Sequence, residues 1–314
     1  FCSKMFDAVE NPCHRPIFYT PMPIGSPDSD STACSKEVEE GYTVIKTLGK
    51  GRFTEVKEVQ QKGTRKHFAW KQVQLDKDPR CDLQIQLLRR VKHNNILRIY
   101  DVYWAAGVMD IMLELCSGTM ADCIGSQRDT SGTSGYRTPS RTEVAKTLSQ
   151  LLMAVNFLHE NQVAHRNIKP CNVLLSSKRT WKLANFDLAC DFDPGHHMSE
   201  RVGSLPYRAP EIDQRKYTEK CDVYSTGVLF IAFVRGKEYV RSSLEDIKGS
   251  KGTEAAEELL NEKTWTSKLG YGALSLAKQM ISLEEARCGS EEALRNPWLM
   301  QNLGSRPGLC CVVS

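Results

Sequence analysis

The stretch that decides the fold is His165-Arg-Asn-Ile-Lys-Pro-Cys-Asn-Val-Leu-Leu175, a largely polar run that ends in three apolar residues. Further along the chain come Lys182-Leu-Ala-Asn-Phe-Asp187 and Ala209-Pro-Glu211. Before it lie Phe68-Ala-Trp-Lys71 and the glycine-rich Leu48-Gly-Lys-Gly-Arg-Phe-Thr-Glu-Val56. Glycines at such a turn let the backbone fold over phosphates and point its amides at them. Each motif alone is a weak signal, but five in this order are not expected by chance.

The hydrophobic pattern changes from strand-like to helical along the chain. Strands are predicted over 42–48, 54–60, 66–73, 96–102 and 108–115, and helices over 82–92, 144–159 and 222–234. This order predicts an α+β protein with a small β-rich lobe (41–116) and a larger α-helical lobe (117–300). Residues 1–40 have no apolar period and predict a mobile tail, and 301–314 predict a C-terminal tail.

The composition excludes several classes of protein. The 314 residues are 40% hydrophobic and 25% charged, which is too apolar for a disordered chain. A net charge of +4 on a mixed surface gives no case for nucleic-acid binding. The 12 cysteines form no CxxC pair, which favours reduced thiols in the cytoplasm. The longest apolar run, Val228 to Val234, is far shorter than the ~20 residues that span a bilayer.

The five motifs together resemble the eukaryotic protein kinase family, of the Ser/Thr type. Three further stretches are similar to its calcium/calmodulin-dependent and calcium-dependent branch: Val202-Gly-Ser-Leu-Pro-Tyr-Arg-Ala-Pro-Glu211, Lys216-Tyr-Thr-Glu-Lys-Cys-Asp-Val-Tyr-Ser-Thr-Gly227 and Glu292-Ala-Leu-Arg-Asn-Pro-Trp-Leu299. The resemblance covers about residues 41–300 and implies the bilobal kinase fold, with helix C in the small lobe.

The resemblance also implies a nucleotide site. Glycines 49 and 51 would cover the phosphates of ATP, and Lys71 would contact them. The residues that would sandwich or hydrogen-bond the adenine are Val56, Ala69, Leu174 and the hinge from Glu114 to Cys116. In the catalytic loop, Lys169 and the metal ligand Asn172 match the family.

Several catalytic positions depart from the family pattern. Asn167 stands where an Asp accepts the proton of the substrate hydroxyl, and a carboxamide is a very poor base. Asn185 stands where an Asp holds Mg²⁺, a cation that prefers carboxylate. Gln84 replaces the helix-C Glu, which predicts a poorly positioned Lys71. Thr54 replaces the third glycine of the loop and should crowd the phosphates.

Two functions fit these departures. One is a pseudokinase that binds ATP weakly, with or without Mg²⁺, and acts as a scaffold or allosteric regulator of a protein partner such as an active kinase. The alternative is a divergent active Ser/Thr kinase that uses Asp187 as the metal ligand. Asp187 lies two residues after Asn185, and on a strand such residues face the same side.

The parts of the family that support the fold are kept. Glu211 and Arg287 match a buried ion pair, and Asp222 matches a residue that bonds the His165-Arg166 backbone. The stacked hydrophobic column that joins the lobes matches Leu88, Ile99, His165 and Phe186.

Three other segments carry weaker expectations. The polar stretch 125–142 predicts a solvated insert rather than a phosphorylation site, and His196-His197 predicts an exposed pair. Cys311-Val-Val-Ser314 fits a farnesylation pattern and predicts membrane association through a lipidated Cys311, although only Arg306 lies nearby as a basic residue.

Overall fold

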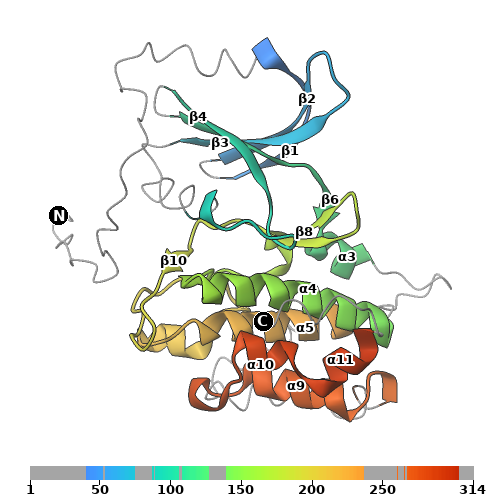
Figure 1. Cartoon of the computed structure of the whole chain (residues 1–314), viewed down its shortest axis with the longest axis vertical. Coiled ribbons are helices and arrows are strands. Elements are labelled where there is room, and N and C mark those ends of the chain that lie inside the picture. The colour runs from blue at the N-terminus through green and yellow to red at the C-terminus, as the bar shows by residue number, and fades with distance from the viewer. Residues whose placement is uncertain are drawn as a thin grey trace, which may run out of the picture.

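A computed structural model describes residues 40–51, 54–74, 87, 89–105, 108–126, 139–236, 260, 265 and 267–303. Its ribbon has two lobes, a sheet above and a group of helices below (Figure 1). The predicted bilobal α+β class is therefore confirmed. No helix in these described ranges is both long and apolar enough to cross a lipid bilayer.

The upper lobe is a five-stranded antiparallel sheet with the order β1-β2-β3-β5-β4. Its strands are β1 (Tyr42–Lys50), β2 (Thr54–Gln61), β3 (His67–Gln74), β4 (Ile99–Ala105) and β5 (Val108–Glu114). Neighbouring residues along a strand point to opposite faces. Trp70 and Met112 accordingly pack on one face, whereas Ala69 and Leu113 pack on the other.

The fourth strand begins three residues later than the sequence pattern predicts. Ile96 forms a parallel bridge with Leu183, and the N–H of Leu97 donates to the carbonyl of Leu183 (2.9 Å). These residues therefore join the upper lobe to the lower one instead of extending the sheet. Of the predicted helix 82–92, the structure describes Leu87, Arg89 and Arg90 as helical, and Gln84 lies outside the described residues.

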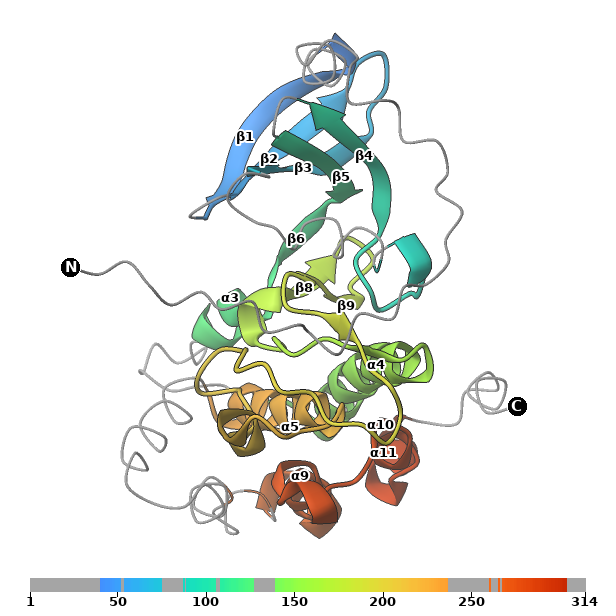
Figure 2. The ribbon, with the colours of Figure 1, turned by 90° about the vertical axis from the view of Figure 1, so that its left-hand side faces the viewer.

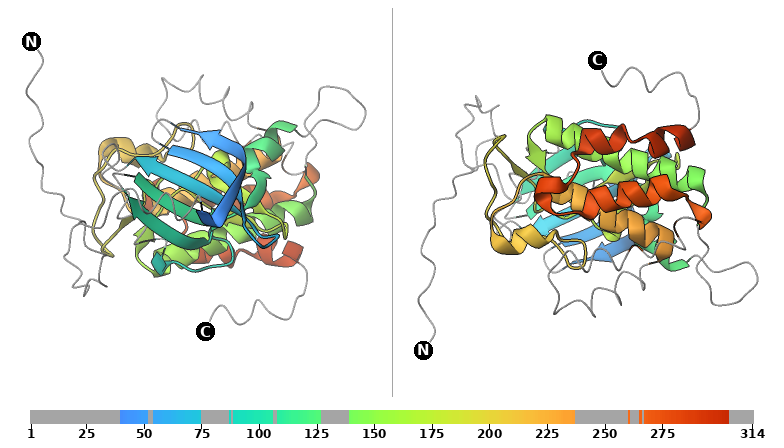
Figure 3. Two further views of the ribbon diagram at one scale, coloured as in Figure 1. Left: turned by 90° about the horizontal axis from the view of Figure 1, so that it is seen from above. Right: turned by 90° about the horizontal axis from the view of Figure 1, so that it is seen from below.

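The lower lobe is built around two long helices, α4 (Arg141–Glu160) and α5 (Lys220–Arg235). Ser140 caps α4: its hydroxyl accepts from the N–H of Glu143, and the Glu143 carboxylate accepts from the N–H of Ser140. Figure 3 shows shorter helices around this pair: α3 (Met120–Ser126), α9 (Tyr271–Ile281), α10 (Ser290–Leu294) and α11 (Pro297–Leu303).

Helix α5 has apolar residues on nearly all sides, as the sequence predicts. Nearly all of its residues are buried by the elements around it. Phe230 of α5 contacts the rings of Trp265 and Trp298, with centroids 5.2 Å and 6.2 Å away. Gly227 lets α9 approach closely, since a Cβ there would lie 2.7 Å from the side chain of Ile281.

Short strands lie where the two lobes meet, as Figure 2 shows for the first three. They are β6 (Cys116–Thr119), β8 (Val173–Ser176) and β9 (Trp181–Leu183), with β7 (Val163–Ala164) and β10 (Cys190–Asp191) as a separate pair. The described part of the lower lobe also has the 3₁₀ turns η2 (Pro170–Asn172), η3 (Pro210–Gln214) and η4 (Glu284–Ala286). Elements of two to four residues have no detectable period, so the sequence does not predict them.

Candidate active site

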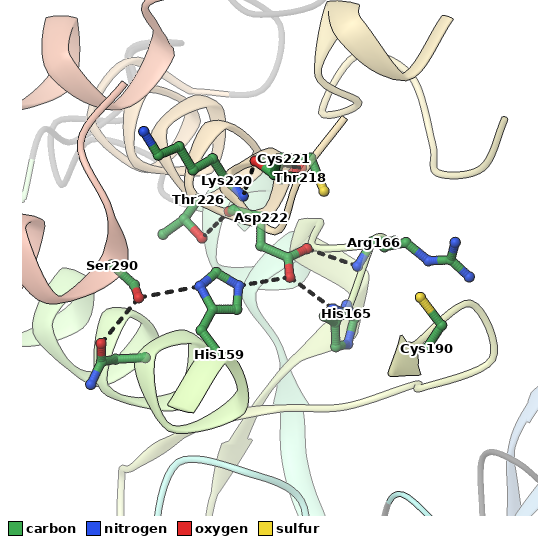
Figure 4. A network of polar contacts seen from close by, with 12 residues as sticks. His159, His165, Arg166, Cys190, Thr218, Lys220, Cys221, Asp222, Thr226 and Ser290 are labelled. Carbon is green, nitrogen blue, oxygen red and sulfur yellow. Dashed lines mark hydrogen bonds and ion pairs between the residues drawn. The ribbon is translucent and has the colours of Figure 1, made fainter. Parts of the chain in front are cut away.

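The loop between β7 and β8 is fixed by one buried carboxylate. Asp222 of α5 accepts the backbone N–H groups of His165 and Arg166, both at 2.7 Å (Figure 4). Burial alone would raise the pKa of Asp222, but a hydrogen bond from His159 and those from the loop hold it below the ordinary value. The predicted contact of Asp222 with this loop is present, and it sets the backbone on which the site is built.

Arg166 ties this loop to the segment that follows β9. Its backbone is left-handed (φ 59°), and its Nε donates to the carbonyl of Leu188 at 2.8 Å. Its other nitrogens reach the Tyr217 hydroxyl at 3.2 Å and the Glu200 carboxylate at 2.8 Å. We call residues 185–211 the activation segment. A buried guanidinium with an ionic partner is a strong anchor, so this segment is held against the loop.

At the position of the catalytic base, the amide of Asn167 ends a short chain of hydrogen bonds. The Ser204 hydroxyl donates to Oδ1 of Asn167 at 3.0 Å, and Nζ of Lys169 donates to the same hydroxyl at 2.7 Å. The sequence reading missed Ser204, although it quoted the motif from Val202 to Glu211 that contains it. The geometry suits a polar loop that holds a hydroxyl, but Asn167 has no basic oxygen to take a proton.

The predicted metal side of the site brings together Asn172, Asn185, Asp187 and Lys71. Nζ of Lys71 lies 3.2 Å from the Asp187 carboxylate, which forms an ion pair across the lobes. In one amide orientation Asn185 donates to Oδ1 of Asn172 (3.3 Å), and in the other it donates to Asp187 (2.9 Å). The second orientation suits a carboxylate, which can only accept.

Two expectations from the sequence are corrected here. Lys71 does have a carboxylate partner, because Asp187 approaches it in place of the lost helix-C Glu. Asn185 and Asp187 are also not on a strand, since β9 ends at Leu183 and Asn185 has a left-handed backbone (φ 63°). Asn tolerates that conformation well.

These residues fit Mg²⁺ poorly. Mg²⁺ prefers carboxylate and water oxygens in a regular octahedron. The set offers two neutral amides, Asn172 and Asn185, and one carboxylate, Asp187, which is already paired with an ammonium. Nδ2 of Asn172 also donates to the carbonyl of Asn167 (2.8 Å), which fixes the amide. No cluster of three or more His, Cys, Asp and Glu side chains suited to a metal occurs among the described residues.

The apolar residues that the family resemblance assigns to the adenine lie close together. Val56, Ala69, Leu174 and Cys116 belong to one apolar cluster under the upper sheet. Burial raises the pKa of the Cys116 thiol to about 12, so it stays neutral. The Glu114 carboxylate pairs with Lys182 (2.9 Å), and the Glu114 N–H donates to the carbonyl of Arg98 (2.9 Å).

The glycine-rich loop is tighter than its two glycines suggest. A Cβ on Gly49 would meet nothing within 4 Å, whereas one on Gly51 would lie 2.6 Å from the Thr54 hydroxyl. The N–H of Gly51 also donates to the carbonyl of Thr54 at 2.8 Å. Thr54 therefore crowds Gly51 and occupies the amide that the glycine-rich loop would point at a phosphate.

The structural parts of the site agree with the sequence reading. Arg287 donates to both oxygens of Glu211, at 2.5 Å and 3.1 Å, in a buried pair. The rings of His165 and Phe186 are in edge contact, 4.9 Å apart. His196 and His197 are exposed, as expected. The side chains of Gln84 and Leu88, residues 127–138 of the polar insert and Cys311 lie outside the described residues.

Residues 42–299 match the family described as protein kinase domain. The chain therefore belongs to the protein kinase family, whose members use ATP with Mg²⁺.

Curated relatives support the Ser/Thr type. Serine/threonine-protein kinase PEPKR2 of Arabidopsis thaliana is 28% identical over 278 residues, covering 87% of this chain and 56% of that protein. Calcium-dependent protein kinase 4 of Plasmodium falciparum (isolate 3D7) is 28% identical over 274 residues, covering 83% and 49%. Cell division control protein 2 homolog 3 of Trypanosoma brucei brucei is 28% identical over 297 residues, covering 84% and 93%. The chain spans about half the length of the first two relatives. The resemblance to Ser/Thr kinases, including the calcium-dependent ones, is confirmed.

Proposed function

We propose that this kinase domain is a pseudokinase, which works by binding rather than by phosphotransfer. The observation that carries the proposal is Asn167 at the base position, where its amide oxygen accepts from Ser204. A neutral amide accepts a hydrogen bond from a hydroxyl, but it is too weak a base to take the proton of a substrate hydroxyl. Loss of a catalytic group of this kind typically costs ~10²-fold or more in rate.

The second part of the proposal is weak binding of ATP that Mg²⁺ barely improves. The apolar residues expected to enclose the adenine lie in one cluster, which supports nucleotide binding. Two features oppose binding of the phosphates: Lys71 is neutralised by Asp187, and Thr54 crowds the glycine-rich loop. The weak fit of Asn172 and Asn185 to Mg²⁺ removes most of the gain that the metal normally brings.

Phosphotransfer to a generic basic peptide tests the proposal. We expect the wild-type rate to equal that of Lys71→Met, since the base is already absent. The double variant Asn167→Asp/Asn185→Asp serves as the gain-of-function comparison, because it restores both carboxylates in place. A wild-type rate that depends on Lys71 contradicts the proposal.

The second candidate is a divergent active kinase, and one observation favours it. Asp187 places a carboxylate beside Asn185 and Lys71, at the side of the site where a metal would bind. In that case Asp187→Ala abolishes any Mg²⁺-dependent activity. In a pseudokinase the same variant has no activity to lose.

We propose that in the cell this domain regulates a protein partner, for example an active kinase. The mixed surface charge gives no case for nucleic-acid binding, and the scattered cysteines support a location in the reducing cytoplasm. Attachment to membranes through a farnesylated Cys311 stays a prediction from the sequence. Mass spectrometry of the intact chain from eukaryotic cells tests it, with Cys311→Ser as the control.

A further inference from the structure

A small apolar cavity lies beside the catalytic loop in the lower lobe. Its volume is about 190 Å³, and it is lined by Ala121, Ile124, Lys169, Pro170, Cys171 and Tyr207. A closed cavity of ~150 Å³ can hold a benzene molecule. This cavity therefore has room for one leucine-sized side chain. It lies between α3 and η2, elements that are in contact with each other.

The charge at this cavity is positive and lacks an acidic counterpart. Lys169 is partly exposed, and its ammonium has no carboxylate partner among the described residues. The reason is local: the neighbouring base position is the neutral Asn167, and within the described part of the chain Lys169 bonds to the Ser204 hydroxyl alone. A cation without an ionic partner at the edge of an apolar cavity favours an anionic ligand group.

Other cations of the same stretch are neutralised. Arg166 pairs with Glu200 (2.8 Å) and Lys182 with Glu114 (2.9 Å), so the charge at the cavity comes from Lys169. At the end of the activation segment, Arg201 and Arg208 share the single carboxylate of Asp213, at 2.6 Å and 2.8 Å.

The acidic residue of α3, Asp122, is bonded to the residue that precedes the helix. Asp122 accepts from the hydroxyl and the N–H of Thr119, at 2.7 Å and 2.9 Å. Burial raises the pKa of Tyr207 to about 12, so its hydroxyl is neutral and remains a donor. The walls are thus almost entirely apolar, and none of the lining residues is acidic.

We infer that this cavity binds a segment of a partner protein that carries an apolar side chain next to an anionic group, either a carboxylate or a phosphate. The inference rests on the proposed function, because it gives the class of partner that the inactive site holds. It predicts that the cavity prefers acidic peptides to basic ones. The anion lies against Lys169, and the apolar side chain enters between Ile124 and Tyr207.

Fluorescence anisotropy with the full chain tests this, in the absence of nucleotide. The probes are labelled peptides of about ten residues with a central leucine flanked by glutamate, by phosphoserine, by glutamine or by arginine. A fifth peptide has glycine in place of leucine between the glutamates. We expect the glutamate or phosphoserine peptide to bind about tenfold tighter than the glutamine one, a difference of ~1.4 kcal/mol. Comparison of the glutamate peptide with the phosphoserine peptide shows whether the cavity prefers a carboxylate or a phosphate.

Three variants locate the binding. Lys169→Met should remove the advantage of the anionic peptides, whereas Lys178→Met, an exposed lysine in the turn after β8, should not. Ala121→Phe should fill the cavity and remove the advantage of leucine over glycine. Melting curves show that each variant is folded.

Several outcomes overturn the inference. They are equal binding of the glutamine or arginine peptide, anion preference that survives Lys169→Met, and no binding of any peptide at about millimolar concentration. Because no nucleotide is present, a failure here leaves the pseudokinase proposal standing. Conversely, phosphotransfer by the wild type contradicts that proposal without affecting this result.

Discussion

In Asn167 and Asn185 an NH₂ group replaces one carboxylate oxygen of aspartate. The side chain therefore keeps the size of aspartate and loses its charge. The structure shows the consequence for each. Asn167 still accepts from Ser204, as a carboxylate would. Asn185 can instead donate to Asp187, which an ionised carboxylate could not do. The hydrogen bonds of the site are therefore satisfied while its negative charge is reduced.

The pairing of Asp187 with Lys71 leads to the first prediction at this scale. Asp187→Ala should bind ATP several-fold more tightly without metal, because the Lys71 ammonium is then free to attract phosphate. Thermal shift against ATP concentration, with EDTA present, measures the change by linkage.

A double-mutant cycle shows whether Asp187 acts through Lys71. In a Lys71→Met background, Asp187→Ala should leave the ATP affinity unchanged. If Asp187→Ala weakens ATP binding only when Mg²⁺ is present, Asp187 is a metal ligand and the active-kinase candidate gains support.

At the scale of elements, the activation segment is held by the chain's own side chains. Arg166 is buried and pairs with Glu200, while the Tyr217 hydroxyl donates to the Glu200 carbonyl at 2.7 Å. A β-bridge between Met198 and Tyr217 closes the same region. Both the side chain and the backbone of Glu200 therefore take part in the anchor.

Glu200→Ala should loosen this segment without unfolding the lobe. Trypsin should then cut after the exposed Arg201 several-fold faster, because cleavage follows the population of locally open states. Asp193→Ala, at an exposed position in the same segment, is the matched control. Equal cleavage rates for the two variants would show that the Arg166–Glu200 pair does not hold the segment.

How far the sequence predicts these elements depends on their length and period. Helices α4 and α5 and the five upper strands have enough repeats for the pattern to locate them, with ends that differ by up to three residues. Ile96 and Leu97 are apolar in a strand-like way but pair with Leu183, which only the tertiary fold determines.

The site could be predicted residue by residue where the family motif fixes a role, but not where a contact crosses the lobes. The ion pair between Lys71 and Asp187 joins residues 116 apart in the chain, and no periodicity connects them. The cavity at Cys171 and Ile124 likewise depends on how α3 packs on η2.

For the whole molecule, the lower lobe depends on one buried cation. The Arg287 side chain is fully buried and donates to Glu211, to the carbonyl of Ser282 and to the carbonyl of Lys220. Its guanidinium also lies 5.0 Å from the ring centroid of Tyr224. These partners join the end of the activation segment to α5 and to the turn after α9.

Arg287→Ala should therefore lower the stability of the entire lobe. Removal of one partner leaves the Glu211 carboxylate buried and unpaired, which typically costs ~3–5 kcal/mol. Urea unfolding measures this as a lower midpoint at unchanged slope.

The chain offers a matched control for that measurement. Arg295 forms an exposed i,i+4 pair with Glu291 (2.6 Å), and such surface pairs contribute only ~0.3–0.5 kcal/mol. Arg295→Ala should thus leave the midpoint nearly unchanged, as should Asn167→Ala, which removes only one neutral hydrogen bond of the catalytic loop. If all three midpoints fall together, burial of the Arg287–Glu211 pair is not what holds the lobe. If Arg287→Ala alone unfolds early, the scaffold depends on this pair, although the catalytic base position can be changed at little cost.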